Sequence, residues 1–321
     1  MKKLFYALIL LFLFTGFNSW AQQLPQFSHY SFNGMYISPG YAGISGQTEL
    51  TAIYRVQWLG YQGSFDAGGA PNTGLFSASV PISALHGGVG VHLVQDQLGA
   101  TTISNGALSY SQHVKLGNGI LGIGVQGLVN RISKGEYRYN DPGDPSVPFN
   151  SADSKFDIGA GLWYQSEKFY LGTGVNNLLR SNYVFEDVDV EETAEAGNIT
   201  GENHVFLTGG VNLDVTSSVV VTPTFIAKYD FNQFSWEAGG RATYNEKLYF
   251  GAGYRYQEAI TGMVGGFPLR ESTLRVGYAF DFTTFGVEAK ARTSHELMVS
   301  YIFPKPANTV RPPVKTPRYS F

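Results

Sequence analysis

The sequence predicts an all-β chain that spans an outer membrane as an antiparallel barrel of about 14 strands. Three observations carry this prediction. First, 15% of the residues are charged, against roughly 25% in ordinary soluble domains, and another 15% are aromatic. Second, short segments alternate apolar and polar residues, and none beyond the N-terminal region approaches the ~20 consecutive apolar residues of a membrane helix. Third, the connections between these segments are long and short in turn.

The N-terminus has the features of a secretory signal peptide. Two lysines precede an apolar run from Leu4 to Phe14, and small residues form an A-x-A-like cleavage site that ends at Ala21. We therefore expect export to the outer membrane of a Gram-negative bacterium, removal of residues 1–21 and a mature chain that begins at Gln22. The absence of cysteine excludes disulfides and cysteine-based zinc sites.

The clearest strand lies between Thr273 and Phe282, where apolar side chains share one face and glycine, small and charged side chains share the other. The apolar face consists of Leu274, Val276, Tyr278, Phe280 and Phe282. This arrangement is typical of a barrel strand with lipid outside and a polar lumen inside. We expect Val276→Arg to destabilise the barrel by roughly 2–4 kcal/mol if it lies near the bilayer midplane, and Gly277→Ala to cost much less.

The same two-residue alternation of apolar and polar side chains, followed along the chain, gives the full set of expected strands. They are 47–58, 72–82, 86–95, 103–115, 119–133, 155–165, 168–176, 204–214, 217–228, 233–244, 247–257, 260–269, 272–283 and 293–303. The expected long connections are 59–71, 96–102, 134–154 and 177–203. Bacterial barrels have long extracellular loops and short periplasmic turns, so the first strand should begin in the periplasm.

Two segments lie outside the expected barrel of residues 47–303. Residues 22–46 contain five aromatic side chains, which are costly to leave in water. This segment is expected either to plug the lumen or to make a periplasmic contact. Residues 304–321 are rich in proline and should run extended in the periplasm, as a solvated linker or as a docking peptide.

Several blocks of sequence carry a family resemblance. They are Leu24–Asn33 with Tyr36–Gly43, Tyr54–Trp58 with Gly69–Thr73, Gly90–Gly99, Phe156–Tyr164 and His295–Tyr301. With these blocks the chain resembles the PorP/SprF family of outer-membrane proteins of the type IX secretion system. The first block departs from the usual family pattern at Leu24, His29, Gly34, Ser38 and Gly40.

The resemblance implies a non-enzymatic barrel without a cofactor. Its implied partners are the type IX secretion machinery, outer-membrane lipid and secreted cargo with a type B C-terminal sorting domain, including the adhesins of gliding bacteria. A porin-like passive channel is the alternative function. An outer-membrane enzyme is a third hypothesis, and nothing in the order of residues nominates a serine or aspartate partner for a histidine.

Acidic side chains gather in the expected loop at 177–203, which carries seven of them against Arg180 alone. Exposure of the loop to solvent explains its acidic composition. The more specific alternatives are contact with a basic partner surface and binding of Ca²⁺. The D-x-D-x-D-G spacing of a Ca²⁺-binding loop is not present. We therefore name partner-binding candidates in the long loops and at an interfacial tryptophan. They are Trp58, Asp141, Asp144, Glu186, Asp187, Asp189, Glu191 and Glu192.

Two further patterns favour structural interpretations. Gly122-x-Gly124-x-x-Gly127 matches a dinucleotide fingerprint, but it falls within an expected strand, where glycine permits curvature or close packing in the lumen. The six histidines show no metal-binding spacing, so we expect no metal site. A formal net charge of -3 gives no general reason to bind nucleic acid.

Overall fold

The computed structural model describes residues 24–62, 69–135, 151–185, 199–269, 273–287 and 290–304. The expected signal peptide lies outside the described residues, as does the expected tail after Pro304. Among the described helices, none is both long and apolar enough to cross a membrane.

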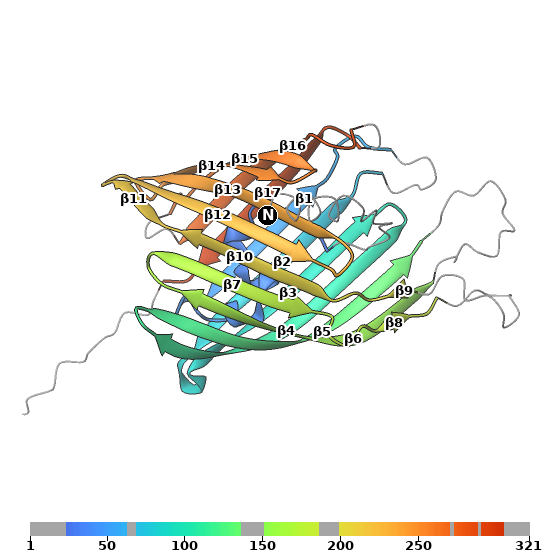
Figure 1. Ribbon diagram of the computed structural model, residues 1–321, viewed down its shortest axis with the longest axis horizontal. Helices are drawn as coiled ribbons and strands as arrows, with labels where there is room; N and C mark the ends of the chain where they lie inside the picture. Colours follow the sequence, from blue (N-terminus) through green and yellow to red (C-terminus); the bar gives the residue numbers. More distant parts are fainter. Residues whose placement is uncertain are drawn as a thin grey trace, which may run out of the picture.

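One sheet of fifteen strands closes on itself, which confirms the predicted barrel (Figure 1). β10 (His204–Val211) and β11 (Leu213–Thr216) both pair with β12 (Val219–Tyr229) and form one strand interrupted at Asn212, so the barrel has 14 strands. The others are β1 (Glu49–Val56), β2 (Asn72–Ile82), β3 (Gly87–Leu98), β4 (Thr101–Leu116), β5 (Gly119–Lys134), β6 (Ala152–Gln165), β7 (Phe169–Asn176), β13 (Phe234–Tyr244), β14 (Leu248–Arg255), β15 (Ala259–Gly266), β16 (Leu274–Thr283) and β17 (Thr293–Ile302).

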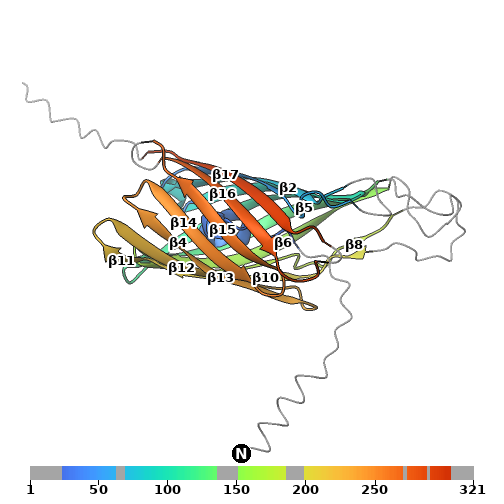
Figure 2. The same ribbon diagram turned by 90° about the horizontal axis from the view of Figure 1, so that it is seen from above.

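The described bases of the long connections lie at one end of the barrel, where the short strands β8 (Asn182–Tyr183) and β9 (Ile199–Thr200) form a separate pair (Figures 1 and 2). Long loops mark the extracellular end of such barrels, so the end that carries β11 faces the periplasm. The expected long connection at 96–102 is wrong. β3 and β4 continue to a two-residue turn, because Gly99 adopts a φ of 61° that suits a tight hairpin.

Side chains alternate along the strands as predicted. On β16, Val276, Tyr278 and Phe282 are exposed on the outer wall, whereas Gly277 and Asp281 are buried inside. The outer wall of the other strands likewise presents apolar side chains, including Leu108, Phe156 and Leu297. The lumen face carries polar and small residues together with some large apolar ones, such as Trp163 and Phe206.

The position of Val276 changes its expected contribution to stability. It is the third residue of β16, which begins at the periplasmic end, so it lies away from the middle of the strand. We expect Val276→Arg to lower the free energy of unfolding by about 1 kcal/mol, below the ~2–4 kcal/mol of a midplane site. Urea titration in detergent micelles, with Val276→Leu as control, measures this, and a loss above 2 kcal/mol would place the residue deeper.

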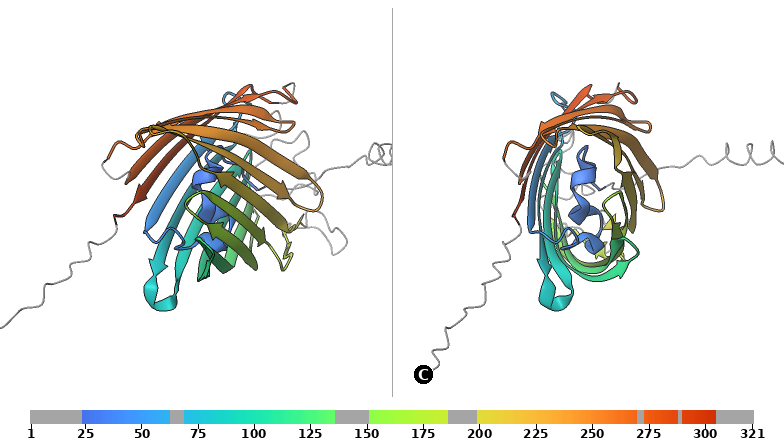
Figure 3. Two further views of the ribbon diagram at one scale, coloured as in Figure 1. Left: turned by 60° about the vertical axis from the view of Figure 1, so that its left-hand side comes forward. Right: turned by 90° about the vertical axis from the view of Figure 1, so that its left-hand side faces the viewer.

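Residues 24–46 lie inside the ring of strands (Figure 3). They form three short helical turns, η1 (Tyr30–Phe32), α2 (Gly34–Ile37) and η2 (Pro39–Tyr41). The main hydrophobic cluster of the molecule joins this segment to inward-facing wall residues such as Trp163, Phe206 and Met298. The core of this barrel is thus built from its own N-terminal segment.

Candidate functional site

The N-terminal segment crosses the lumen from the extracellular to the periplasmic end. Leu24 lies beside His204 and Asp230, which flank the extracellular ends of β10 and β12. Gly43 packs against Pro81 and Gly88 at the periplasmic ends of β2 and β3. The first described residue is therefore near the outside, although β1 begins in the periplasm.

The backbone of the segment touches the wall where the wall has glycine. A Cβ added at Gly122 or Gly124 would overlap the backbone of Gly40, and one at Gly174 would overlap the carbonyl of Ile37. The glycines of the apparent dinucleotide fingerprint at 122 and 124 therefore permit close packing in the lumen, as interpreted from the sequence. Its third glycine is instead half-buried on the outer wall beside the Phe156 ring.

A cluster of buried charges lines the lumen wall. The Arg55 guanidinium on β1 lies 2.6 Å from Asp281 on β16 and 3.4 Å from Glu296 on β17. The Arg255 guanidinium on β14 lies 2.8 Å from Glu237 on β13 and 3.2 Å from Asp281. We call these five side chains the lumen charge cluster. It bridges the seam between β1 and β17, where the barrel closes.

The lumen charge cluster binds the N-terminal segment directly. The backbone amides of Ser28 and His29 each donate to Glu296 at 2.8 Å, and the His29 ring Nδ1 lies 2.7 Å from the same carboxylate. The Ser28 hydroxyl donates to Asp281 at 2.8 Å. Buried charges are costly unless they are paired and hydrogen-bonded, so these contacts complete a cluster that the wall alone would leave under-satisfied.

A second anchor lies nearer the periplasm. The Tyr41 hydroxyl donates to Glu49 at 2.7 Å, and Arg275 lies 3.4 Å from the same carboxylate. The guanidinium of Arg275 also stacks on the Phe32 ring, 4.5 Å from its centroid.

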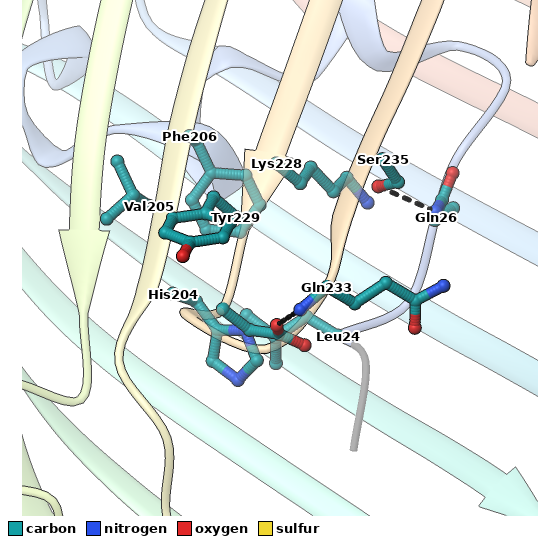
Figure 4. Close-up of a pocket in the computed structure, with 10 residues that line it drawn as sticks. Leu24, Gln26, His204, Val205, Phe206, Lys228, Tyr229, Gln233 and Ser235 are labelled. Carbon is teal, nitrogen blue, oxygen red and sulfur yellow. Dashed lines mark hydrogen bonds between the residues drawn. The ribbon is translucent and has the colours of Figure 1, made fainter. Parts of the chain in front are cut away.

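Two small cavities lie where the segment meets the extracellular end; Figure 4 shows the residues that line one of them. There Lys228 donates to the carbonyl of Pro25 at 3.1 Å, and Gln26 donates to Ser235 at 3.4 Å. The cavity beside them measures about 20 Å³, and a second cavity around Leu24 measures about 30 Å³. Volumes of this size hold only one or two water molecules.

The path of the segment predicts which end of the barrel exposes it. The chain has no cysteine, so single cysteines report their own accessibility. We expect Leu24→Cys, half-buried at the extracellular end, to react with a membrane-impermeant maleimide on intact cells. Asn232→Cys in an exposed extracellular turn is the positive control, and Ser217→Cys in an exposed periplasmic turn is the negative control. Labelling of Leu24→Cys only after permeabilisation would reverse the direction of the segment.

Of the partner-binding candidates, only Trp58 lies within the described residues. Its backbone amide donates to Ser294 at 3.0 Å, and its ring packs against Tyr61 and lies 5.0 Å from the Lys290 ammonium. The candidates outside the described residues are Asp141, Asp144, Glu186, Asp187, Asp189, Glu191 and Glu192. All eight remain predictions. Within the described part of the chain, no group of three or more His, Asp or Glu side chains is placed to hold a metal ion.

Sequence reasoning did not single out the lumen charge cluster. Its acids and arginines lie far apart in the chain, and only the barrel brings them together. One feature of the sequence could have indicated the cluster. Arg55, Asp281 and Glu296 all fall on the lumen face of strands whose side chains alternate, and a charge buried there needs a partner.

Fold and lumen together define an outer-membrane β-barrel whose interior is occupied by its own N-terminal segment. Residues 19–301 match the family described as "Type IX secretion system membrane protein PorP/SprF". The chain therefore belongs to the PorP/SprF family, as the sequence resemblance predicted, and to the outer membrane. No curated protein matches the chain.

The chain is also similar to several proteins of known structure. The Ralstonia pickettii toluene transporter TbuX is 11% identical, with a TM-score of 0.48 over 84% of this chain and 92% of that one. The Acinetobacter baumannii outer membrane protein Omp33 is 8% identical, with a TM-score of 0.42 over 80% and 98%. The CymD monoaromatic hydrocarbon channel is 12% identical, with a TM-score of 0.46 over 84% and 92%. Likeness at this level is one of fold alone.

Proposed function

We propose that this barrel supports the secretion and cell-surface attachment of large cargo proteins with type B C-terminal sorting domains, including the adhesins of gliding cells. It would do so by binding the cargo, the type IX secretion machinery or both. Family membership supports a role in type IX secretion. The observation that favours binding over passive transport is the filled lumen, in which residues 24–46 occupy the path that a solute would take.

The alternative of a porin-like passive channel fits the lumen poorly. An open pore needs a continuous aqueous path, yet buried side chains of the N-terminal segment and wall interlock across the interior. Ser28 and His29 are tied to Glu296 by hydrogen bonds that have no exposure to water. A conducting state would require these buried bonds to break together, at a cost of several kcal/mol.

The extracellular loops are the proposed contact surface, because they contain residues that a bare barrel does not need. The described base of the loop at 177–203 is fixed to the rim. Tyr183 and Phe185 pack on Ile132 of β5, and Arg180 lies 2.9 Å from Glu202. A loop anchored at its base and acidic beyond it would suit a basic patch on a cargo sorting domain, an attraction that salt weakens.

Replacement of residues 184–201 by a short Gly/Ser linker tests the proposal. We expect the barrel to insert and to keep its heat-modifiable migration on gels, because the strands close without the loop. Cargo retained at the cell surface should fall. The matched control replaces the exposed extracellular turn at 231–233 in the same way and should leave cargo attached. Normal cargo retention in the loop variant, with release of cargo after truncation behind Phe303, would make the contact periplasmic.

A further inference from the structure

A groove runs across the outer wall of the barrel over β2 to β5, on the face opposite the filled lumen. The groove is shallow and open along its length, with a volume of about 610 Å³. Small residues on the outer wall, Gly74, Ser104 and Gly106, leave room for it. No heavy atom lies within 4 Å of the place where a Cβ of Gly74 would stand.

The walls of the groove change from apolar to polar along the membrane normal. Phe76, Leu93 and Val129 are exposed and apolar, and Gly106 joins them in one row of paired residues across the four strands. The next row of outward residues, two positions nearer the extracellular end, is Gly74, Gln95, Ser104 and Arg131. The groove is therefore amphipathic, and its polar row faces the outside.

Arg131 places a positive charge at the polar edge of this groove. Its side chain is exposed on the outer wall and donates to the Ser154 hydroxyl at 3.3 Å. Among the described residues, no carboxylate lies within ion-pair distance of it. A guanidinium binds phosphate oxygens through paired hydrogen bonds, and Gln95 and Ser104 in the same row offer further polar contacts.

We propose that this groove binds a phosphorylated glycolipid of the outer leaflet. One acyl chain lies over Gly106 between Phe76, Leu93 and Val129, and a phosphate group pairs with Arg131. Charge and position support this occupant. The cation lies at the extracellular edge, which is where a lipid of the outer leaflet carries its phosphate, and the apolar row lies below it, toward the hydrocarbon. The site is independent of the proposed cargo contact.

The test measures lipid that stays with the full barrel after extraction from its native outer membrane in mild detergent. Native mass spectrometry should find a phosphorylated glycolipid on the wild type. Arg131→Gln removes the phosphate contact, and Gly74→Leu fills the groove from a position where an added Cβ meets no neighbour within 4 Å. Each should reduce the bound fraction by about tenfold, because a charge-assisted hydrogen bond or a lost apolar contact is worth at least ~1.4 kcal/mol.

Two controls separate this site from general lipid adhesion. Ala78→Leu adds the same kind of bulk to the outer face of β2, four residues beyond Gly74 toward the periplasm and outside the groove. It should retain lipid like the wild type, and Arg131→Lys should retain more than Arg131→Gln. Heat-modifiable migration shows that each variant is folded. Equal retention in all variants, a glycerophospholipid or a polypeptide in place of the glycolipid, or no bound lipid on the wild type would overturn the proposal.

Discussion

Arg255→Met is expected to destabilise the barrel by about 3–5 kcal/mol, the usual cost of removing one partner from a buried ion pair. Arg255 is fully buried and contacts Glu237, Asp281 and Glu258, so its loss leaves two buried carboxylates with reduced compensation. Methionine replaces the aliphatic stem and removes the guanidinium with its charge and its hydrogen bonds to Glu237 and Asp281. Urea unfolding in micelles, followed by heat-modifiable migration, measures the loss.

The same substitution at Arg180 is the matched control. Arg180 pairs with Glu202 on the surface, with 54% of its side chain exposed, so Arg180→Met should change stability by less than about 1 kcal/mol. Adding Glu237→Gln to Arg255→Met should restore part of the loss, because it neutralises the carboxylate that Arg255 leaves behind. Equal effects of the two arginine variants would mean that the lumen charge cluster is hydrated and contributes little.

The arginine variant also probes the link between the lumen charge cluster and closure of the lumen. Asp281 holds Ser28 as well as Arg255, so a disturbed cluster loosens the N-terminal segment. Transient currents across a planar bilayer should therefore appear more often with Arg255→Met than with wild-type protein. Silent bilayers for both would show that the aromatic packing of residues 24–46 keeps the lumen closed without the charges.

The barrel could be predicted from the sequence because lipid imposes a local rule. Every spanning strand must alternate an apolar outer face with a lumen face, so the period-two pattern of β6 or β16 identifies the strand without its neighbours. Turn geometry was harder to predict. Gly99 tightens one connection to two residues, and Asn212 interrupts the strand formed by β10 and β11; both depend on local backbone detail that alternation does not specify.

The contents of the lumen follow no such rule. The aromatic residues of the N-terminal segment indicated that it must be buried, but both a lumen position and a periplasmic contact satisfied that requirement. Which of the two positions the segment takes depends on partners far away in the chain. Glu296, for example, contacts His29 and lies 267 residues from it in the sequence. Lumen-facing glycines were the clearest local hint, since they mark where a second backbone approaches the wall.

At Gly277, the alternation of side chains along the strand and the packing inside the lumen lead to different expectations. The sequence suggested that Gly277→Ala would be mild, because the residue faces a polar lumen. The structure leads to a different expectation, since a Cβ at this position would overlap the Tyr249 hydroxyl and the His29 ring, both of which are buried. The lumen face here is a packed interior, where added volume strains both neighbours.

We expect Gly277→Ala to lower the free energy of unfolding by about 1–3 kcal/mol, more than Val276→Arg on the adjacent outer face. A second substitution identifies the cause. The Tyr249 hydroxyl has no hydrogen-bond partner among the described residues, so Tyr249→Phe alone should be nearly neutral. In the double variant, Tyr249→Phe should recover much of the loss from Gly277→Ala and none of the loss from Val276→Arg. If Gly277→Ala costs less than Val276→Arg, or gains nothing from Tyr249→Phe, the Tyr249 hydroxyl of β14 does not pack against Gly277.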